Sequence, residues 1–397
     1  MNEVGAADRR RTVVRRALLA AVLGVAVLYT PLAVNYMWFA FDSGAGRWQD
    51  ALTAAVNGGD YAYRAGSVDS VRKVDFVDNR WVMLVHTGLG GIALLLMVHQ
   101  LTPRLRRRSL AAHRWVGRVY FVLMVISMLT ALIFLVSAGP AEALIGNAFY
   151  LQLWALDFGT LLSGALGLLA IRRRNLLGHQ AWMYLNFALM MTAPFLRVVW
   201  IFAAPLFPDQ VLLDNLGMGS SMLGVIAPGG AAIAMQLSLR SRGGSGEAVW
   251  DAVPNVRLGV PLLVALVGGA LLVIRYRQVD DVLPGGIFWV PLGAAAVYLA
   301  VCVLGAGNSA RREDRELQAR WRILLWGAAT APLSVLAVDL AAGVLWGAPS
   351  GLLAGLMVGI AFPILVSYTL VVHGLAGTAG ITSPPRWAVA RRTMHSV

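Results

Sequence analysis

The chain of 397 residues is poor in cysteine, in lysine and in charge. Its single cysteine, Cys302, excludes an intrachain disulfide and any zinc or iron–sulfur site built from cysteines. Only 13% of the residues are charged, whereas 58% are hydrophobic, and the mean hydropathy is +0.68. Lys73 is the one lysine, so the net charge of +13 comes from arginine. Such a composition excludes an ordinary soluble domain and is typical of a polytopic membrane protein.

Familiar catalytic motifs are also lacking. The hydrophobic runs contain no H-E-x-x-H, no G-x-S-x-G and no aspartate-rich diphosphate motif. No nucleic-acid partner is indicated, because the arginines lie in short loops between apolar runs, where they set membrane topology. A cleavable signal peptide is not indicated either. The apolar run after Arg9–Arg16 extends from Ala17 to about Phe41, which is too long, and we expect it to be a retained first span.

Hydrophobic runs long enough to cross a bilayer recur along the chain and predict an all-α, polytopic transmembrane helix bundle of about ten spans. The expected spans are residues 17–40, 81–102, 115–138, 149–171, 180–204, 218–239, 258–275, 286–307, 323–346 and 351–375. A polar segment with Gly and Ser, residues 241–257, follows the sixth span. We therefore expect a six-helix membrane unit at 1–240, a cytoplasmic linker, and a four-helix unit with a cytoplasmic tail at 258–397.

Alternate loops between the spans are rich in arginine, which predicts the orientation of the bundle. The arginine-rich segments are Arg9–Arg16, Arg104–Arg108, Arg172–Arg174, Arg240–Arg242, Arg311–Arg322 and Arg386–Arg392. By the positive-inside rule this side faces the cytoplasm of a bacterial inner membrane, and both termini lie there. Loop 41–80 then lies outside, where we expect a short lid over the bundle with a turn at Asn57–Asp60.

Three ionisable residues lie deep inside the apolar runs: His86, Asp157 and Arg197. A helical rise of about 1.5 Å per residue places each of them roughly 7–13 Å below the outer surface. Ionisable groups in hydrocarbon are costly, so each is a candidate catalytic or substrate-binding residue. We expect Asp157 to pair with Arg197 and His86 to orient this pair or to exchange protons with it.

A second polar layer is expected near the cytoplasmic face. His99 ends the second span, His113 opens the third, His179 opens the fifth, and Arg114 and Arg118 share a helix face. These residues would suit one haem b, which needs two imidazoles from facing helices and basic groups for its propionates. A second haem is not expected, because the outer layer holds no second histidine. The alternative for this layer is structural: the residues would anchor helix ends or bind lipid phosphate.

Helical periodicity predicts that polar and small residues face the interior of the bundle. The predicted stripes are His179, Met183, Asn186, Met190 and Arg197 in the fifth span, His113, Gly117, Tyr120, Met124 and Met128 in the third, and Tyr150, Asp157, Thr160 and Gly164 in the fourth. Methionine at helical spacing is usually a packing residue, so no metal site is expected.

The sequence leaves three functions open. The first is a haem-binding redox protein with a small-molecule substrate such as a quinone. The second is a proton-coupled transporter, with His86, Asp157 and Arg197 as its outward-facing site. No pair of spans is evidently broken into half-helices, which argues against a transporter. The third is a membrane enzyme that acts on a lipid or isoprenoid, with His86 and Asp157 as acid and base.

Four short patterns follow one another between Trp81 and Phe202. They are H-x3-G at His86–Gly90, H-R-x2-G-R-x-Y at His113–Tyr120, G-H-x2-W-M at Gly178–Met183, and a membrane arginine at Arg197. Together they resemble a bacterial family of predicted membrane proteins, domain of unknown function 2306. The resemblance implies a helical membrane core with His and Arg on inward faces, and it implies no particular reaction. The chain departs from the family at Tyr184–Asn186, where a basic residue commonly stands.

Overall fold

The computed structural model describes residues 2–42, 44–63, 76–140, 146–238 and 258–380. Within these ranges the protein is all-helical and has no strand. Ten helical segments are long and apolar enough to cross a membrane, which confirms the predicted fold class. Their bounds are Leu19–Ala40, Arg80–Leu101, Leu110–Ala138, Asn147–Arg172, Leu176–Ala203, Leu212–Ser238, Gly259–Tyr276, Gly285–Arg311, Arg315–Trp346 and Ala348–Leu375.

The helices follow the order of the spans. The first six spans are formed by α1 (Asn2–Asn35), α5 (Arg80–Leu101), α7 (Leu110–Ala138), α8 (Asn147–Arg172), α9 (Leu176–Met190) with α10 (Thr192–Ala203), and α11 (Leu212–Ser238). The last four are formed by α13 (Gly259–Tyr276), α14 (Gly285–Arg311), α15 (Arg315–Trp346), and α16 (Ala348–Ala354) with α17 (Ala361–Gly380). Helix η1 (Trp38–Ala40) ends the first span, and three short helices of the described residues lie between spans: α2 (Trp48–Asn57), α3 (Gly59–Tyr63) and α6 (Pro103–Arg108).

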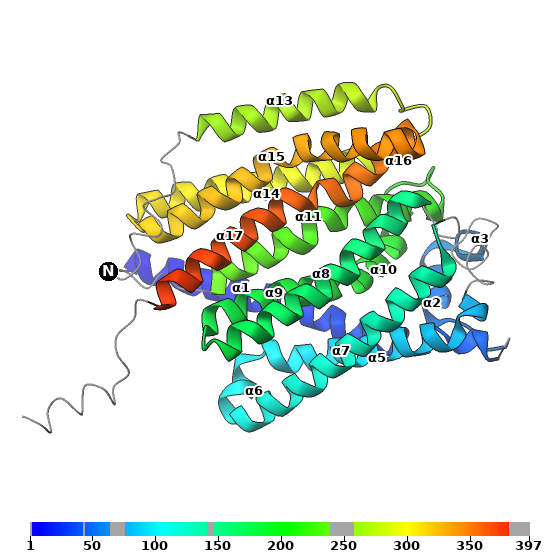
Figure 1. Ribbon diagram of the computed structural model, residues 1–397, viewed down its shortest axis with the longest axis horizontal. Coiled ribbons are helices and arrows are strands. Elements are labelled where there is room, and N and C mark those ends of the chain that lie inside the picture. The colour runs from blue at the N-terminus through cyan, green and yellow to red at the C-terminus, as the bar shows by residue number, and fades with distance from the viewer. Residues whose placement is uncertain (1, 43, 64–75, 141–145, 239–257, 381–397) are drawn as a thin grey trace, which may run out of the picture.

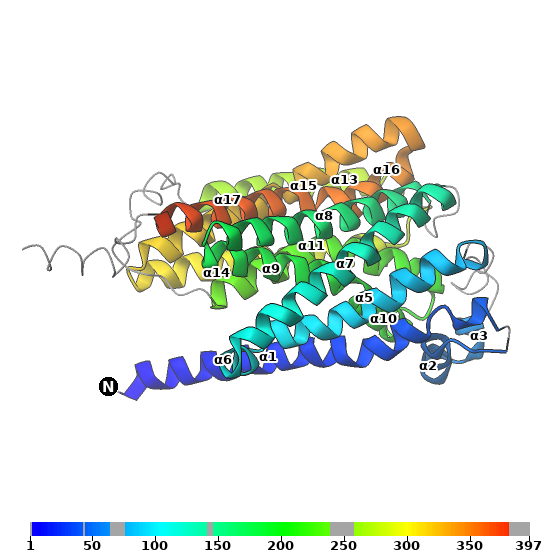
Figure 2. The ribbon, with the colours of Figure 1, turned by 60° about the horizontal axis from the view of Figure 1, so that its bottom comes forward.

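The long helices run side by side, so the bundle has two ends (Figures 1 and 2). One end carries the start of α1, the short helix α6 and the last turns of α17, and we call it the terminal end. The opposite end carries α2 and α3, and we call it the lid end. The predicted arginine-rich loops that fall within the described residues lie at the terminal end, as alternation of the spans requires.

The predicted six-helix and four-helix units pack against each other. Helix α17 lies on α9 and α11, and the largest group of buried hydrophobic residues draws on both units. The Tyr368 hydroxyl of α17 donates a 2.5 Å hydrogen bond to the carbonyl of Ala181 in α9. Gln152 Nε2 of α8 donates to the carbonyl of Met357 at 3.1 Å. The predicted linker, residues 241–257, lies outside the described residues.

Two spans consist of successive helical segments, although each remains a single membrane-spanning segment. The fifth span changes from α9 to α10 at Met191. Pro194 has no N–H to donate to the carbonyl of Met190, and its ring disfavours a straight continuation of the helix. The tenth span contains a π-helical segment at Gly355–Gly359, closed by the hydrogen bond from Ile360 N to Gly355 O at 3.1 Å. Such local changes of helix type often mark functional positions.

Helices α2 and α3, which belong to the predicted loop 41–80, pack against the bundle. Gly58, at φ +87°, forms the predicted turn between α2 and α3. Asn57 Nδ2 donates to the carbonyl of Ile201 in α10 at 2.8 Å. Tyr61 binds α11, because Asn215 Nδ2 donates to its hydroxyl at 2.7 Å. Burial raises the pKa of the Tyr61 phenol, which therefore stays a neutral hydrogen-bonding group at physiological pH.

Candidate functional site

A cavity of about 230 Å³ lies between α1, α5, α7, α8, α9 and α10, in the half of the bundle nearer to the lid end. Its wall includes all three predicted outer residues: His86 of α5, Asp157 of α8 and Arg197 of α10. Most of the remaining wall is apolar, with Leu94, Leu153, Leu156, Met190 and Leu196 among its side chains. An apolar cavity with a few convergent polar groups is typical of a small-molecule site.

Asp157 carries the most unusual group in this wall. The residue is only 4% exposed, and neither carboxylate oxygen has a hydrogen-bond partner among the described residues. The nearby Thr160 hydroxyl does not help, because it donates to the carbonyl of Leu156 at 2.7 Å. An unpartnered carboxylate in an apolar setting is stable only when it gains a proton or a ligand that can donate to it.

Arg197 is held by aromatic rings. Its guanidinium carbon lies 4.7 Å from the ring centroid of Trp200 and 5.4 Å from that of Tyr36. No ion pair or hydrogen bond joins Arg197 to Asp157, so the predicted direct pair is wrong. The cation–π contacts explain the difference, since they hold the guanidinium against the α1 side of the cavity. The Tyr36 ring also lies 5.5 Å from the guanidinium carbon of Arg47, so it stands between two cations.

His86 is fixed by α7. Its Nδ1 lies 2.9 Å from the carbonyl oxygen of Ser127, and the Ser127 hydroxyl donates to the carbonyl of His86 at 2.8 Å. Because a carbonyl only accepts, Nδ1 must carry the proton, and Nε2 then carries the lone pair of the neutral ring. Gly90 permits this arrangement, since a Cβ there would lie 3.0 Å from Ser127 Oγ. The H-x3-G pattern thus anchors the imidazole.

A buried hydrogen-bonded group separates the cavity from the terminal end. The Tyr120 hydroxyl donates to Asn186 Oδ1, and Asn186 Nδ2 donates to the carbonyl of Thr160 at 2.8 Å and to Ser163 Oγ at 3.1 Å. Tyr120 and Asn186 are 2% and 0% exposed. The sequence placed both residues on inward stripes, which is confirmed, but it did not indicate that they bind each other. We call these four residues the polar clamp, because they join α7, α8 and α9.

The three histidines near the terminal end also come together. His113 lies close enough to His99 and His179 for their charges to interact. His179 Nδ1 lies 2.9 Å from the carbonyl oxygen of Gly167, whereas Nδ1 of His99 and of His113 are buried without a partner among the described residues. Among those residues no group of three or more His, Cys, Asp or Glu side chains could hold a metal ion.

Of the two predicted basic residues, Arg114 lies close enough to His113 for their charges to interact. Both Arg114 and Arg118 are exposed on α7. The packing around the histidines is also close. A Cβ on Gly167 would lie 3.0 Å from Met183 Sδ, and one on Gly117 would lie 3.4 Å from Gln100 Oε1. A cavity with room for a ligand lies at the outer layer, and none of the three histidines lines it.

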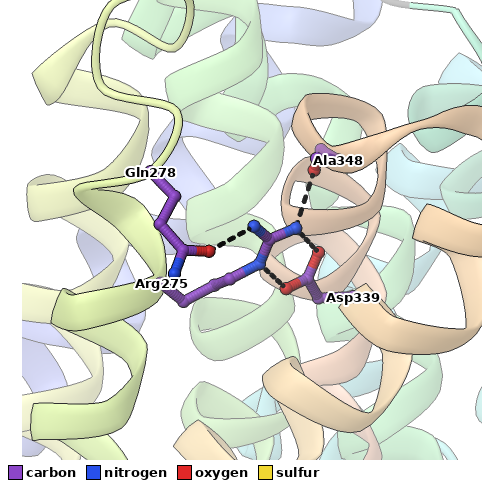
Figure 3. A network of polar contacts seen from close by, with 4 residues as sticks. All are labelled: Arg275, Gln278, Asp339 and Ala348. Atoms are coloured by element: carbon purple, nitrogen blue, oxygen red, sulfur yellow. Dashed lines mark hydrogen bonds and ion pairs between the residues drawn. The ribbon is translucent and has the colours of Figure 1, made fainter.

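The four-helix unit contains a buried aspartate that is paired with an arginine, in contrast to Asp157 of the cavity. Arg275 Nε donates to Asp339 Oδ2 at 2.6 Å, and Arg275 Nη2 donates to Oδ1 at 3.2 Å. Figure 3 shows this two-point contact and the further bonds of Arg275 to Gln278 and to the carbonyl of Ala348. Asp339 lies inside the ninth span, and Arg275 lies at the end of the seventh. Both carboxylate oxygens of Asp339 are bound by Arg275, so we assign this pair a structural role.

The fold and the cavity define a polytopic α-helical membrane protein with a polar site inside its membrane-spanning region. Residues 83–227 match the model of the family described as Predicted membrane protein (DUF2306), which confirms the resemblance found in the sequence. The match extends from α5 into α11 and includes His86, Asp157 and Arg197. No curated protein and no solved structure matches the chain.

Proposed function

We propose that the protein is a proton-coupled carrier of a small solute in a bacterial cytoplasmic membrane, with its lid end outside. One observation carries this proposal: His86, Asp157 and Arg197 face a single cavity from three helices, and Asp157 has no partner there. Intramembrane ionisable groups that line a cavity are typical of proton-coupled and substrate-coupled pathways.

Each of the three side chains has a distinct part in this mechanism. Asp157 takes up a proton when its carboxylate lacks another partner, and releases it when a ligand donates to the carboxylate. Arg197 supplies a fixed positive charge, because the rings of Tyr36 and Trp200 hold it without neutralising it. His86, oriented through Nδ1, offers Nε2 as a further acceptor.

The interrupted fifth span supports carrier function. Thr192, Ala193 and Leu196, from the first turns of α10, line the cavity directly after the break at Met191. Carriers commonly bind their substrates beside discontinuous helices, where rigid segments can rotate about the break. The polar clamp joins α7, α8 and α9 on the terminal-end side of the cavity. Alternating access would require the clamp to open, and the Gly-rich π-helical segment of the tenth span adds a second flexible point.

The test uses purified protein in proteoliposomes that contain a pH-sensitive dye. Small acids, amines and amino acids are added outside, and solute-dependent proton movement is recorded. We expect Asp157→Asn and Arg197→Gln to abolish the movement while folded protein remains in the vesicles. The matched controls are Asp280→Asn and Arg277→Gln, whose side chains are 38% and 70% exposed. Wild-type proton movement by Asp157→Asn protein would contradict the proposal.

Haem binding at the terminal end stays a prediction from the sequence, as does an enzyme that would use His86 and Asp157. A haem there would be held by His113 and His179 and would supply one-electron transfer. Close packing around the histidines opposes it, and we assign no step to it. We expect purified protein, expressed with ample haem, to show no Soret band. A Soret band that is lost in His113→Ala or His179→Ala protein would instead support a redox function.

A further inference from the structure

We infer that the solute is dipolar: it carries an anionic group that binds Arg197 and an amino group that binds Asp157, joined to a small apolar body. A small apolar amino acid has this chemistry. The inference rests on the proposed carrier function and names the class of its substrate.

The unpaired charges that line the cavity indicate a dipolar solute. Arg197 has no acidic partner and Asp157 has no basic partner, although both line the same cavity. An arginine alone would select an anion, and an aspartate alone would select a cation or a proton. A plain cation is disfavoured by the fixed charge of Arg197, and a plain anion leaves Asp157 without a donor. A dipolar ligand gives Arg197 an anionic partner and Asp157 a cationic partner, and it adds no net charge to the membrane interior.

The acceptors that line the cavity suit an ammonium group. An ammonium has three N–H donors. Asp157 presents two unpartnered oxygens to the cavity wall, and the tautomer fixed by Ser127 leaves the His86 Nε2 lone pair as a third acceptor. At the other end, a guanidinium binds a carboxylate through paired hydrogen bonds. Arg197 Nε is buried and has no partner among the described residues, so it is one donor that a carboxylate could use.

Size and wall chemistry limit the rest of the ligand. The cavity of about 230 Å³ is smaller than the pockets of roughly 300–1,000 Å³ that hold drug-sized ligands. Leucine, methionine, phenylalanine and alanine side chains make up most of its wall, so the body of the ligand should be apolar. These limits favour a single small amino acid over a peptide, a nucleotide or a sugar.

A different ligand would satisfy the same carrier function: a monocarboxylate that enters together with a proton on Asp157. The two ligands predict opposite pH dependence. A proton competes with an ammonium for Asp157, so binding of a dipolar ligand weakens as the pH falls. A monocarboxylate needs the protonated Asp157 as a donor, so its binding strengthens as the pH falls.

The other ionisable groups of the cavity leave this test intact. They are Tyr29 and Tyr36 from the α1 side, His86 from α5 and Arg197 from α10, and the lining residues of α7, α9 and α11 include no ionisable group. Tyrosine and arginine do not titrate between about pH 5 and pH 8 in water. A proton on His86 would repel an ammonium, and it therefore acts in the same direction as a proton on Asp157.

The experiment is calorimetric titration of the detergent-purified full chain with glycine, leucine, phenylalanine and 4-aminobutanoate. Each is compared with the matching acid that lacks the amine and with the matching amine that lacks the carboxylate. We expect at least one amino acid to bind about tenfold or more tightly than both of its analogues. Its affinity should fall between about pH 8 and pH 5. Asp157→Asn should weaken this pH dependence, leaving only the contribution of His86, and should make the amino acid bind no more tightly than the acid.

Two results would overturn the inference. In one, an acid binds as tightly as its amino acid and binds more tightly at lower pH, which leaves the carrier proposal standing with a different substrate class. In the other, no amino acid binds to protein whose thermal unfolding shows that it is folded. Solute-driven proton movement in proteoliposomes then decides separately whether the carrier proposal also fails. Asp280→Asn and Arg277→Gln again serve as controls, since both side chains lie at the surface.

Discussion

Asp157 and Asp339 are both buried inside spans, but only Asp339 has a partner among the described residues. Asp339 has a side chain that is 0% exposed and binds Arg275 through both oxygens. Asp157 is 4% exposed and binds no described residue. A buried carboxylate that is already neutralised can only stabilise the fold, whereas an unpartnered one is available to a proton or a ligand. Residue type alone therefore does not separate the two.

The two side chains of the Arg275–Asp339 pair differ in exposure, and this difference gives a prediction about stability. Arg275→Leu leaves the fully buried Asp339 charge without a partner, and we expect it to lower the free energy of unfolding by about 3–5 kcal/mol. Asp339→Asn leaves a partly exposed arginine, 21% exposed at its side chain, which can extend to water, so about 1–3 kcal/mol is expected. Unfolding in mixed detergent micelles would measure both, with Arg277→Leu as the surface control. Equal losses from the two variants would contradict this reasoning.

At this scale the sequence identified the right residues but not their partners. The cost of burying His86, Asp157 and Arg197 was sufficient to single them out, and all three line one cavity. The expectation that Asp157 pairs with Arg197 failed because depth in the membrane does not give the direction of a side chain. The aromatic faces of Tyr36 and Trp200 compete for the guanidinium, and only their three-dimensional positions reveal it.

At the scale of the helices, the break between α9 and α10 links the fold to the site. Hydrophobic length predicted the fifth span as one unit, residues 180–204, and the structure gives Leu176–Ala203. Pro194 was visible in the sequence, but a proline inside an apolar span either bends the helix slightly or ends it. The interruption itself depends on packing against α11 and on the Thr192 hydroxyl, which donates to the carbonyl of Leu189 at 2.6 Å.

Pro194→Ala should weaken ligand binding without lowering the stability of the protein. The alanine N–H can donate to the carbonyl of Met190, so we expect unchanged or increased thermal stability and a straighter span. The same change moves Arg197 relative to Asp157, and ligand affinity should fall by about tenfold or more, because shifts near 1 Å are costly in a preorganised site. Calorimetry and thermal unfolding of one sample measure both quantities.

The control for this substitution is Pro291→Ala, which removes a buried proline from the interior of α14. Pro291 does not line the cavity. Its replacement should therefore leave ligand affinity unchanged. Similar losses of affinity in both proline variants would show that the effect reflects general helix stiffness. The break at Met191 would then have no specific role in ligand binding.

At the scale of the whole molecule, the bundle has two chemically different ends. The arginines of α6 and of the start of α7 are exposed at the terminal end, and they include Arg104, Arg106, Arg107, Arg108 and Arg114. The lid end carries Asp42, Asp50, Asp60 and Asp78 among its described residues. The cavity lies nearer to the lid end, so the orientation of the bundle decides whether solute enters from outside or from the cytoplasm.

We expect the terminal end to face the cytoplasm, and the single native cysteine makes this testable. Cys302 is 0% exposed, so it should not react with a membrane-impermeant maleimide while the protein is folded, and new cysteines can be added to the native background. Asp60→Cys in α3 and Arg107→Cys in α6 both replace exposed residues at opposite ends of the bundle. In intact cells Asp60→Cys protein should be labelled and Arg107→Cys protein should not, whereas both should react after the membrane is permeabilised. The reverse pattern would place the cavity nearer to the cytoplasm, and Asp157 would then take its proton from inside the cell.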